Sequence, residues 1–171
     1  MIREYAPIGL IPAAWAMTFT TMIYPGISTY WIQHMHYFMI LFLAGFTVLS
    51  WKEMEYNPVL DIWRKIIGAG ILFTGLGALS FSAKNYSPML SGLSLGYWLV
   101  APGVGSYLSA RDMSDYVKEY RGVGYAGLTA LLLAFTGIFS GLETVTAAGF
   151  LLAAVSQTYS IFIAAKLDDN L

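Results

Sequence analysis

The sequence has 171 residues, and its long apolar stretches contain few side chains able to do acid–base chemistry. Its ten acids and nine Lys and Arg residues lie in polar segments or near the ends of apolar stretches. An ionisable group at membrane depth is costly and usually functional. The partial exception, Glu143, opens the last apolar stretch, where it either caps a helix N-terminus or guards a pore mouth. The capping role is the simpler interpretation, and we expect no catalytic residue and no enzyme activity.

The two histidines, His34 and His36, stand two positions apart in WIQHMHYF. On a helix they point to roughly opposite sides, whereas in an extended segment they could share one metal ion. With no cysteine and no third histidine, the chain cannot build a zinc–thiolate site, an iron–sulfur cluster or a bis-histidine haem site by itself. We therefore expect no metal and no cofactor. A net charge of -1 also makes nucleic acid an improbable partner.

Uncharged polar side chains remain inside the apolar stretches, among them Thr20, Thr74, Thr136 and Gln157. Such groups hydrogen-bond neighbouring helices, and that structural role is the simpler one at any single position. Together they could also line a narrow path for a small neutral or weakly acidic solute, because hydroxyls replace hydration without fixing a charge. The segment SQTYS, residues 156–160, is the densest polar patch at depth.

The stretch GLSLGYWLVAPGVGSYLSARD, residues 92–112, combines small residues with a central proline. Gly92 and Gly96 form a GxxxG spacing, which favours close helix contact in a membrane. Pro102 lacks an N–H and leaves the carbonyl near Trp98 without its helical partner, so that another helix, a hydroxyl or water must satisfy it. The pattern predicts a bent, closely packed helix. This helix has two interpretations: it forms a solute site beside Tyr97, or it packs in a bent form with no site.

Composition defines the elements that must position these residues. The chain is 57% hydrophobic and 11% charged, with a mean hydropathy of +0.62, against about 25% charged residues in soluble domains. Because a membrane-spanning helix needs about 20 apolar residues, we predict one all-α transmembrane domain over residues 1–171. Five spans, with the last pair as one re-entrant unit, are the alternative. The six predicted spans lie near residues 7–27, 33–51, 64–82, 88–109, 123–140 and 144–165.

Cationic residues gather on one side of this six-span arrangement, and only Lys84 falls on the other. Cytoplasmic loops carry such an excess, so we expect both termini in the cytoplasm and the protein in the plasma membrane. Phe-Thr pairs at 19–20, 73–74 and 135–136 recur in alternate spans, for which three tandem helical hairpins are the simplest description. The cations on the first side are Arg3, Lys52, Arg64, Lys65, Arg111, Lys118, Arg121 and Lys166.

The N-terminal residues EYAPIGL resemble the Asn-Pro-Ala-Pro-Leu-Gly-Leu signature of the acetate/succinate uptake transporters, with matches at Ala6, Pro7, Gly9 and Leu10. The resemblance implies a six-helix bundle around a pore, usually hexameric, that moves small monocarboxylates. It also implies that the matching residues stand at the entrance of the first helix. The sequence departs from the family at Glu4 and Tyr5 and lacks its glycine-rich second-helix pattern.

Two hypotheses of different class follow from these patterns. The leading one is a channel or transporter for a small neutral or weakly acidic solute, such as a short monocarboxylate, acting as a homo-oligomer. The alternative is a non-catalytic accessory or structural subunit of a larger membrane complex. The candidate residues for a transport path are Pro7, Gly9, Thr20, Thr74, Gly96, Tyr97, Pro102, Thr136 and Gln157.

Overall fold

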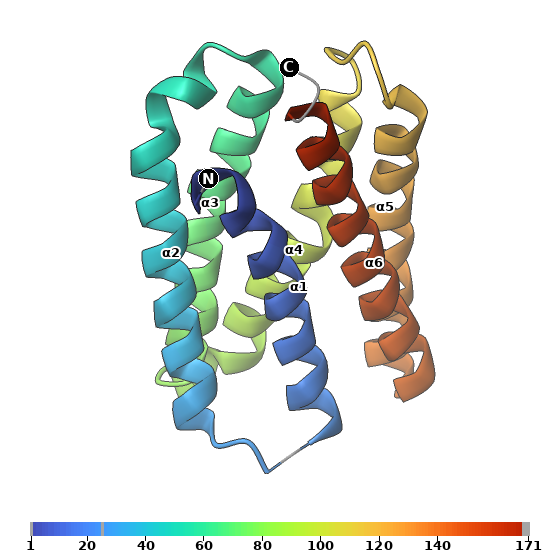
Figure 1. The fold of residues 1–171 in the computed structure, drawn as a ribbon. Helices are drawn as coiled ribbons and strands as arrows, with labels where there is room; N and C mark the ends of the chain where they lie inside the picture. Colours follow the sequence, from blue (N-terminus) through green and yellow to red (C-terminus); the bar gives the residue numbers. More distant parts are fainter. Residues whose placement is uncertain (1, 25, 169–171) are drawn as a thin grey trace.

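The helices account for almost all of the described chain. The computed structural model describes residues 2–24 and 26–168, and the side chains of residues 11–21, 24 and 26–166. Successive helices run up and down the bundle, so that α1 starts and α6 ends toward the same end of it (Figure 1). The elements are α1 (Ile2–Ile23), α2 (Thr29–Glu55), α3 (Pro58–Ser80), the short 3-10 helix η1 (Lys84–Tyr86), α4 (Ser87–Ser109), α5 (Val117–Ser140) and α6 (Glu143–Asp168).

The all-α prediction is confirmed for the described residues. Four of the helices, α2, α3, α5 and α6, are long and apolar enough to cross a membrane. Helices α1 and α4 have 22 and 23 residues, which is also sufficient length for a span. Several helices extend beyond the apolar stretch that predicted them, because polar residues at their ends continue the helix. Helix α5, for example, begins at Val117, six positions before the predicted span.

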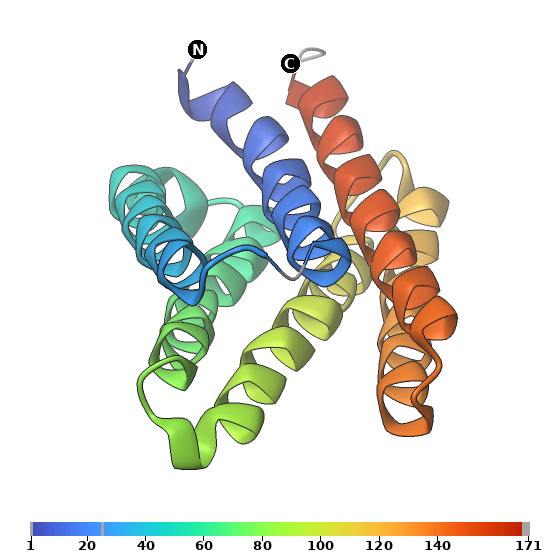
Figure 2. The same cartoon turned by 90° about the horizontal axis from the view of Figure 1, so that it is seen from below.

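The predicted hairpin of the first two helices does not form. Within the described residues α1 packs against α6, and α2 packs against α3. Figure 2 shows α1 beside α6 while α2 stands apart with α3. The physical reason is that each helix finds its partner elsewhere: Trp15 of α1 contacts Phe150 of α6, and Gln33 of α2 donates to the Ala78 carbonyl at the end of α3. The other two hairpins, α3–α4 and α5–α6, are present.

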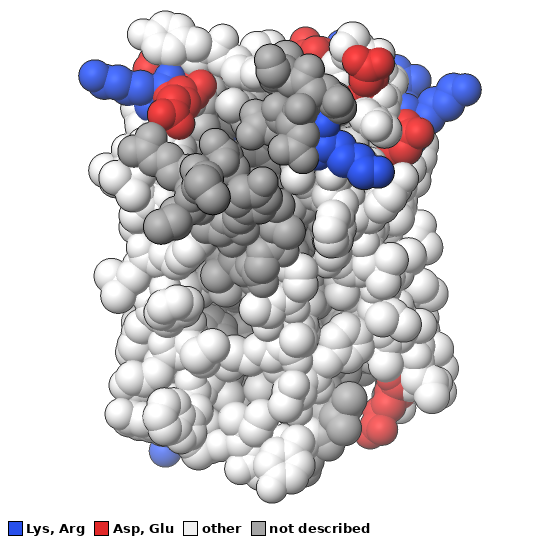
Figure 3. Space-filling view, viewed as in Figure 1, with Lys and Arg blue, Asp and Glu red and all other residues white. Residues whose placement is uncertain are grey.

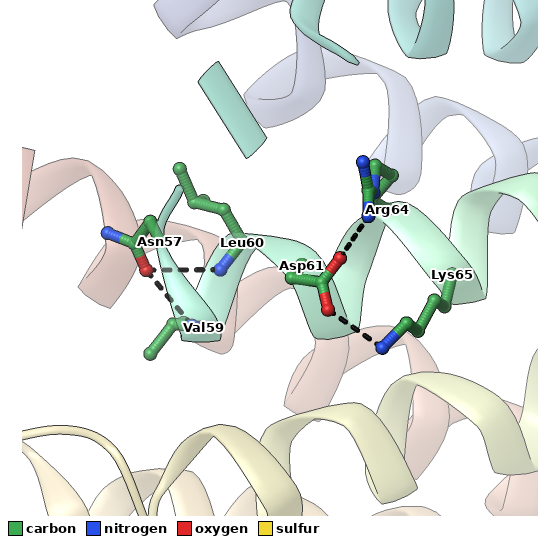
Figure 4. Close-up of polar contacts among 6 residues, drawn as sticks. All are labelled: Asn57, Val59, Leu60, Asp61, Arg64 and Lys65. Carbon is green, nitrogen blue, oxygen red and sulfur yellow. Dashed lines mark hydrogen bonds and ion pairs between the residues drawn. The ribbon is translucent and has the colours of Figure 1, made fainter. Parts of the chain in front are cut away.

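The start of α3 follows a clear local signal. The Asn57 side chain accepts hydrogen bonds from the amides of Val59 and Leu60 at 2.9 and 3.2 Å, which satisfies donors that a helix start leaves free. Pro58 is the first helical residue, where its missing N–H costs nothing. One turn on, Asp61 is paired with Arg64 and Lys65 (Figure 4). The cap and the ion pairs together stabilise the N-terminal end of α3.

Small residues set the spacing of the core helices. A methyl group built on Gly149 of α6 would lie 2.5 Å from the Ala134 nitrogen of α5, so the two backbones are in direct contact. Gly103 of α4 and Gly127 of α5 approach each other in the same way. Close backbone approach of this kind is how helices associate where lipid supplies no hydrophobic force. The buried apolar core between these helices comprises Trp15, Leu99, Ala130, Ala134, Phe150 and Ala153.

Candidate functional site

A chain of side-chain hydrogen bonds crosses the interior from α1 to α3, and we call it the central network. The Trp15 Nε1–H of α1 donates to Gln157 Oε1 of α6 at 3.0 Å. Gln157 Nε2 donates to the Trp98 carbonyl of α4 at 2.9 Å. The Trp98 indole N–H then donates to Thr74 Oγ1 of α3 at 3.0 Å. Four residues therefore join four helices through their side chains.

The position of Pro102 explains why Gln157 points at α4. In a regular helix the N–H of residue 102 would bond the carbonyl of residue 98, and proline has no N–H. Helix α4 nevertheless continues through Pro102, and the Gln157 amide supplies the missing donor to the Trp98 carbonyl. An unsatisfied carbonyl in a membrane interior costs several kcal/mol. Gln157 is 4% exposed, so its amide replaces a backbone donor in a dry environment.

Thr74 and Gly70 hold the indole ring at the far end of the central network. Thr74 Oγ1 donates to the Gly70 carbonyl one turn earlier, at 2.7 Å, and accepts from Trp98 at the same time. A methyl group on Gly70 would lie 2.7 Å from the Trp98 ring. Both residues are buried. The glycine leaves space for the indole, and the threonine gives its N–H an acceptor.

Of the predicted path residues whose side chains the structure describes, Thr74 and Gln157 belong to the central network, and Pro102 frees the carbonyl that Gln157 satisfies. Thr20 is exposed, and its hydroxyl donates to the Ala16 carbonyl of its own helix. Thr136 is exposed on the outer face of α5. The Tyr97 ring stacks on Phe73 with centroids 4.2 Å apart, and its hydroxyl donates to the Ile66 carbonyl. These side chains join helices or face outwards, although the Tyr97 ring also meets the Trp98 ring of the central network edge to face, with centroids 5.5 Å apart.

The remaining predicted residues have simpler positions. Gly96 faces the Phe135 ring of α5, which a methyl group there would approach to 3.5 Å. The backbones of Pro7 and Gly9 belong to α1, and their side-chain surroundings lie outside the described residues.

Two tryptophans were missed as candidates. Trp15 and Trp98 both stand inside apolar stretches, away from the ends where interfacial aromatic belts form. A buried indole N–H needs an acceptor, and the mid-membrane polar side chains Thr74 and Gln157 are the acceptors it finds. The sequence signal that could have revealed them is a tryptophan in the middle of a predicted span. Because such spans contain few uncharged acceptors, the indole N–H had few possible partners.

Other buried hydroxyls mostly bond to their own helices. Ser156 and Ser160, in the polar patch of α6, donate to the carbonyls of Ala153 and Gln157 at 3.1 and 2.8 Å. Two hydroxyls of α4 differ, because Ser106 and Ser109 are fully buried and have no hydrogen-bond partner within the described residues. They lie one and two turns beyond Pro102, on the side of the charge-rich end of the bundle.

The two histidines lie on α2, in a helix and not in the extended segment that a shared metal would need. The His34 ring stacks on Tyr30 with centroids 3.9 Å apart and is exposed. The His36 ring meets Phe81 edge to face and lies where a methyl group on Gly77 of α3 would touch it. The described residues hold no group of three or more His, Cys, Asp or Glu side chains that could bind a metal ion. Each ring has a packing role in the structure.

Charged side chains occupy the two ends of the molecule. On the face in Figure 3 an uncharged band separates them, as expected for a bilayer-facing surface. Lys84 lies between α3 and α4, and Glu143 lies at the start of α6. Both are at the end of the bundle opposite the start of α1 and the end of α6. The other described cations all lie at the terminal end: Lys52, Arg64, Lys65, Arg111, Lys118, Arg121 and Lys166.

These observations define the class of the protein as a helical bundle with four helices long and apolar enough to cross a membrane. Comparisons with protein-family models, with curated proteins and with solved structures gave no match. The function is therefore argued from the geometry of this chain alone.

Proposed function

We propose that this chain is a six-span integral membrane protein that serves as a non-catalytic structural subunit of a larger membrane complex. The observation that carries this proposal is the central network. Gln157 and Thr74, the most deeply placed polar residues of the predicted path, already have their hydrogen bonds within the protein. A path for a solute needs polar groups that can exchange partners with the solute. Groups that hold four helices together are not free to do so.

The hollows on the described surface support the same proposal. One lies between α4 and α5 and is lined by Val104, Tyr107, Tyr125 and Leu128 among others. Another lies on α5 around Leu132, Phe135 and Phe139. Both are mainly apolar, and neither includes a residue of the central network. These hollows suit lipid or a neighbouring helix better than a hydrated solute.

Helix α2 offers the surface for a partner. In the described part of the chain it packs mainly on α3, and only 11% of its apolar window is buried. Aromatic residues are enriched at protein interfaces, and a helix held on one side only leaves its other faces to lipid or to another chain. We propose that a second membrane subunit covers this face. Its exposed large side chains are Tyr30, Trp31, Met35, Tyr37, Phe38, Leu41, Val48, Leu49 and Trp51.

Solute passage remains a second candidate because of Ser106 and Ser109. Their hydroxyls are buried and unpartnered within the described residues, so a small polar molecule that reached them would supply the missing hydrogen-bond partner. The resemblance of EYAPIGL to the acetate/succinate uptake transporters implies a monocarboxylate as that molecule. In this case the path would run beside α4 at the charge-rich end or along the axis of a homo-oligomer.

One preparation decides between the two candidates. The full chain is purified from its native membranes in a mild detergent, and a portion is reconstituted into liposomes. We expect it to co-migrate with other membrane proteins, and we expect labelled acetate to cross the liposomes no faster than it crosses empty ones. Migration as a pure homo-oligomer, together with acetate flux that a Ser106→Val variant abolishes, would establish the transport function instead.

We further propose that the charge-rich end faces the cytoplasm of a plasma membrane, with both termini there, following the positive-inside rule. The chain has no cysteine, so single cysteines report topology directly. A Lys84→Cys variant in intact cells should react with a membrane-impermeant maleimide. A Lys118→Cys variant should react only after the cells are opened. The reverse pattern would invert the orientation, and labelling of both variants in intact cells would show that α4, which lies between these two positions, does not cross the membrane.

A further inference from the structure

The hollow between α4 and α5, which we call the groove, is large enough for part of one hydrocarbon chain. Gly103, Gly124 and Gly127 bring the two backbones together at its floor, so the larger side chains on either side leave space between them. The cavity volume is about 170 Å³. An apolar cavity of about 150 Å³ is large enough to hold benzene. The groove therefore accommodates a short length of an acyl chain.

Two tyrosines mark the end of this groove nearest the charged side chains. Tyr107 of α4 and Tyr125 of α5 meet edge to face with ring centroids 5.8 Å apart. Both are partly exposed, and both line the cavity. Tyrosine favours the level of the lipid headgroups, where its ring is apolar and its hydroxyl is wet. A chain lying in the groove would thus carry its headgroup just beyond these rings.

Cationic side chains stand at that same level. The Arg111 guanidinium, two residues past the end of α4, lies 5.9 Å from the centre of the Tyr107 ring. Arg121 precedes Tyr125 by four residues and Lys118 precedes Arg121 by three, so helical spacing puts them on the groove side of α5. Glu119, two residues before Arg121, falls on the opposite side of the helix. The α5 charges on the groove side are therefore positive, while Asp112 and Asp115 belong to the loop between α4 and α5.

These cations have no carboxylate partner among the described residues. Within residues 2–24 and 26–168, Arg111, Lys118 and Arg121 form no ion pair, whereas Arg64 and Lys65 share Asp61. All three are exposed. An arginine guanidinium matches phosphate geometry with two parallel hydrogen bonds. Unpaired arginines at the mouth of an apolar groove are complementary to an anionic lipid.

We propose that this groove binds one anionic phospholipid, with an acyl chain along Val104 and Leu128 and the phosphate between Arg111 and Arg121. Basic sites between membrane helices on the cytoplasmic side recognise anionic headgroups. The proposal depends on the membrane embedding of the chain and is independent of its role as a structural subunit, so it holds or fails separately from that role.

The test measures lipid binding to the purified full chain by native mass spectrometry. The probes are phosphatidylglycerol and phosphatidylcholine with identical acyl chains, and glycerol phosphate as a headgroup without chains. We expect one phosphatidylglycerol to bind at least about 10-fold more tightly than phosphatidylcholine. In the Arg111→Gln/Arg121→Gln variant this preference should disappear. The matched control, Lys52→Gln/Lys84→Gln, removes the same charge away from the groove and should keep the preference.

A second pair of variants tests the groove itself. Leu128→Trp fills the cavity and should lower the occupancy of both lipids. Leu72→Trp, at an exposed position of α3 that lines neither hollow, should not. Unchanged helix content by circular dichroism shows that each variant is folded. Equal binding of the two lipids to the wild type, or a preference that survives the double arginine variant, overturns the proposal. Tight binding of glycerol phosphate alone would replace it with a site for a free anion.

Discussion

Replacing Gln157 with leucine should lower the free energy of unfolding by about 2 to 4 kcal/mol. The substitution removes two hydrogen bonds at once and leaves the Trp15 indole N–H and the Trp98 carbonyl without partners. Each of the two buried groups left unsatisfied costs about 1 to 3 kcal/mol. The lower part of that range applies, because a side-chain hydrogen bond in a membrane protein contributes only about 0.6 to 1.7 kcal/mol. Detergent titration of unfolding, followed by tryptophan fluorescence, measures the change.

The control for this prediction is the neighbouring substitution Ser156→Ala. Ser156 is buried to a similar degree, but its hydroxyl bonds only to the Ala153 carbonyl of its own helix. Its loss should therefore change the stability by less than about 0.5 kcal/mol. Equal effects of the two substitutions would mean that Gln157 contributes local packing and does not join helices.

The second large effect is expected at Gly149, where substitution by alanine should cost about 3 kcal/mol or more. The added methyl group would lie 2.5 Å from the Ala134 nitrogen and 2.8 Å from the Ala130 carbonyl oxygen, both backbone atoms of α5. A backbone cannot turn aside as a flexible side chain can, so α5 and α6 must separate. Overpacking in a tight core typically costs about 1 to 3 kcal/mol, and separated helices also lose neighbouring contacts.

Gly122 provides the matched comparison on α5. A methyl group there meets nothing within 4 Å, and alanine is the better helix former by about 0.5 to 1 kcal/mol. The Gly122→Ala variant should therefore be slightly more stable than the wild type in the same unfolding assay. If Gly149→Ala proved as stable as Gly122→Ala, the close contact of α5 with α6 would be wrong.

The sequence predicted that Pro102 leaves a backbone carbonyl of its helix without a donor, but it did not predict which residue supplies that donor. Pro102 must free a carbonyl near Trp98, and its partner had to come from outside the local helix. That this partner is Gln157 depends on α6 lying beside α4. The sequence suggested packing of adjacent helices in hairpins, whereas α1 leaves α2 and packs on α6 through Trp15. Such long-range choices depend on shape complementarity that no local pattern encodes.

The sequence also did not predict the rotation of each helix about its own axis, which decides the side chains that are buried. Thr74 and Thr136 both follow a phenylalanine in an apolar stretch, yet Thr74 is buried and Thr136 is exposed. A helix that is apolar on every face has no periodic pattern to show which side meets its neighbours. Helix ends were predicted unevenly. Glu143, expected at a helix N-terminus, opens α6, whereas α3 begins at Pro58 after the Asn57 cap, six positions before the predicted span.

The most direct test of the central network is a double-mutant cycle between Pro102 and Gln157. Pro102→Ala restores a backbone N–H that can bond the Trp98 carbonyl within α4, so the carbonyl no longer depends on the glutamine. The Gln157→Leu substitution should then cost at least about 1 kcal/mol less in the Pro102→Ala background than in the wild type. The same cost in both backgrounds would contradict the claim that Gln157 replaces the donor that proline lacks.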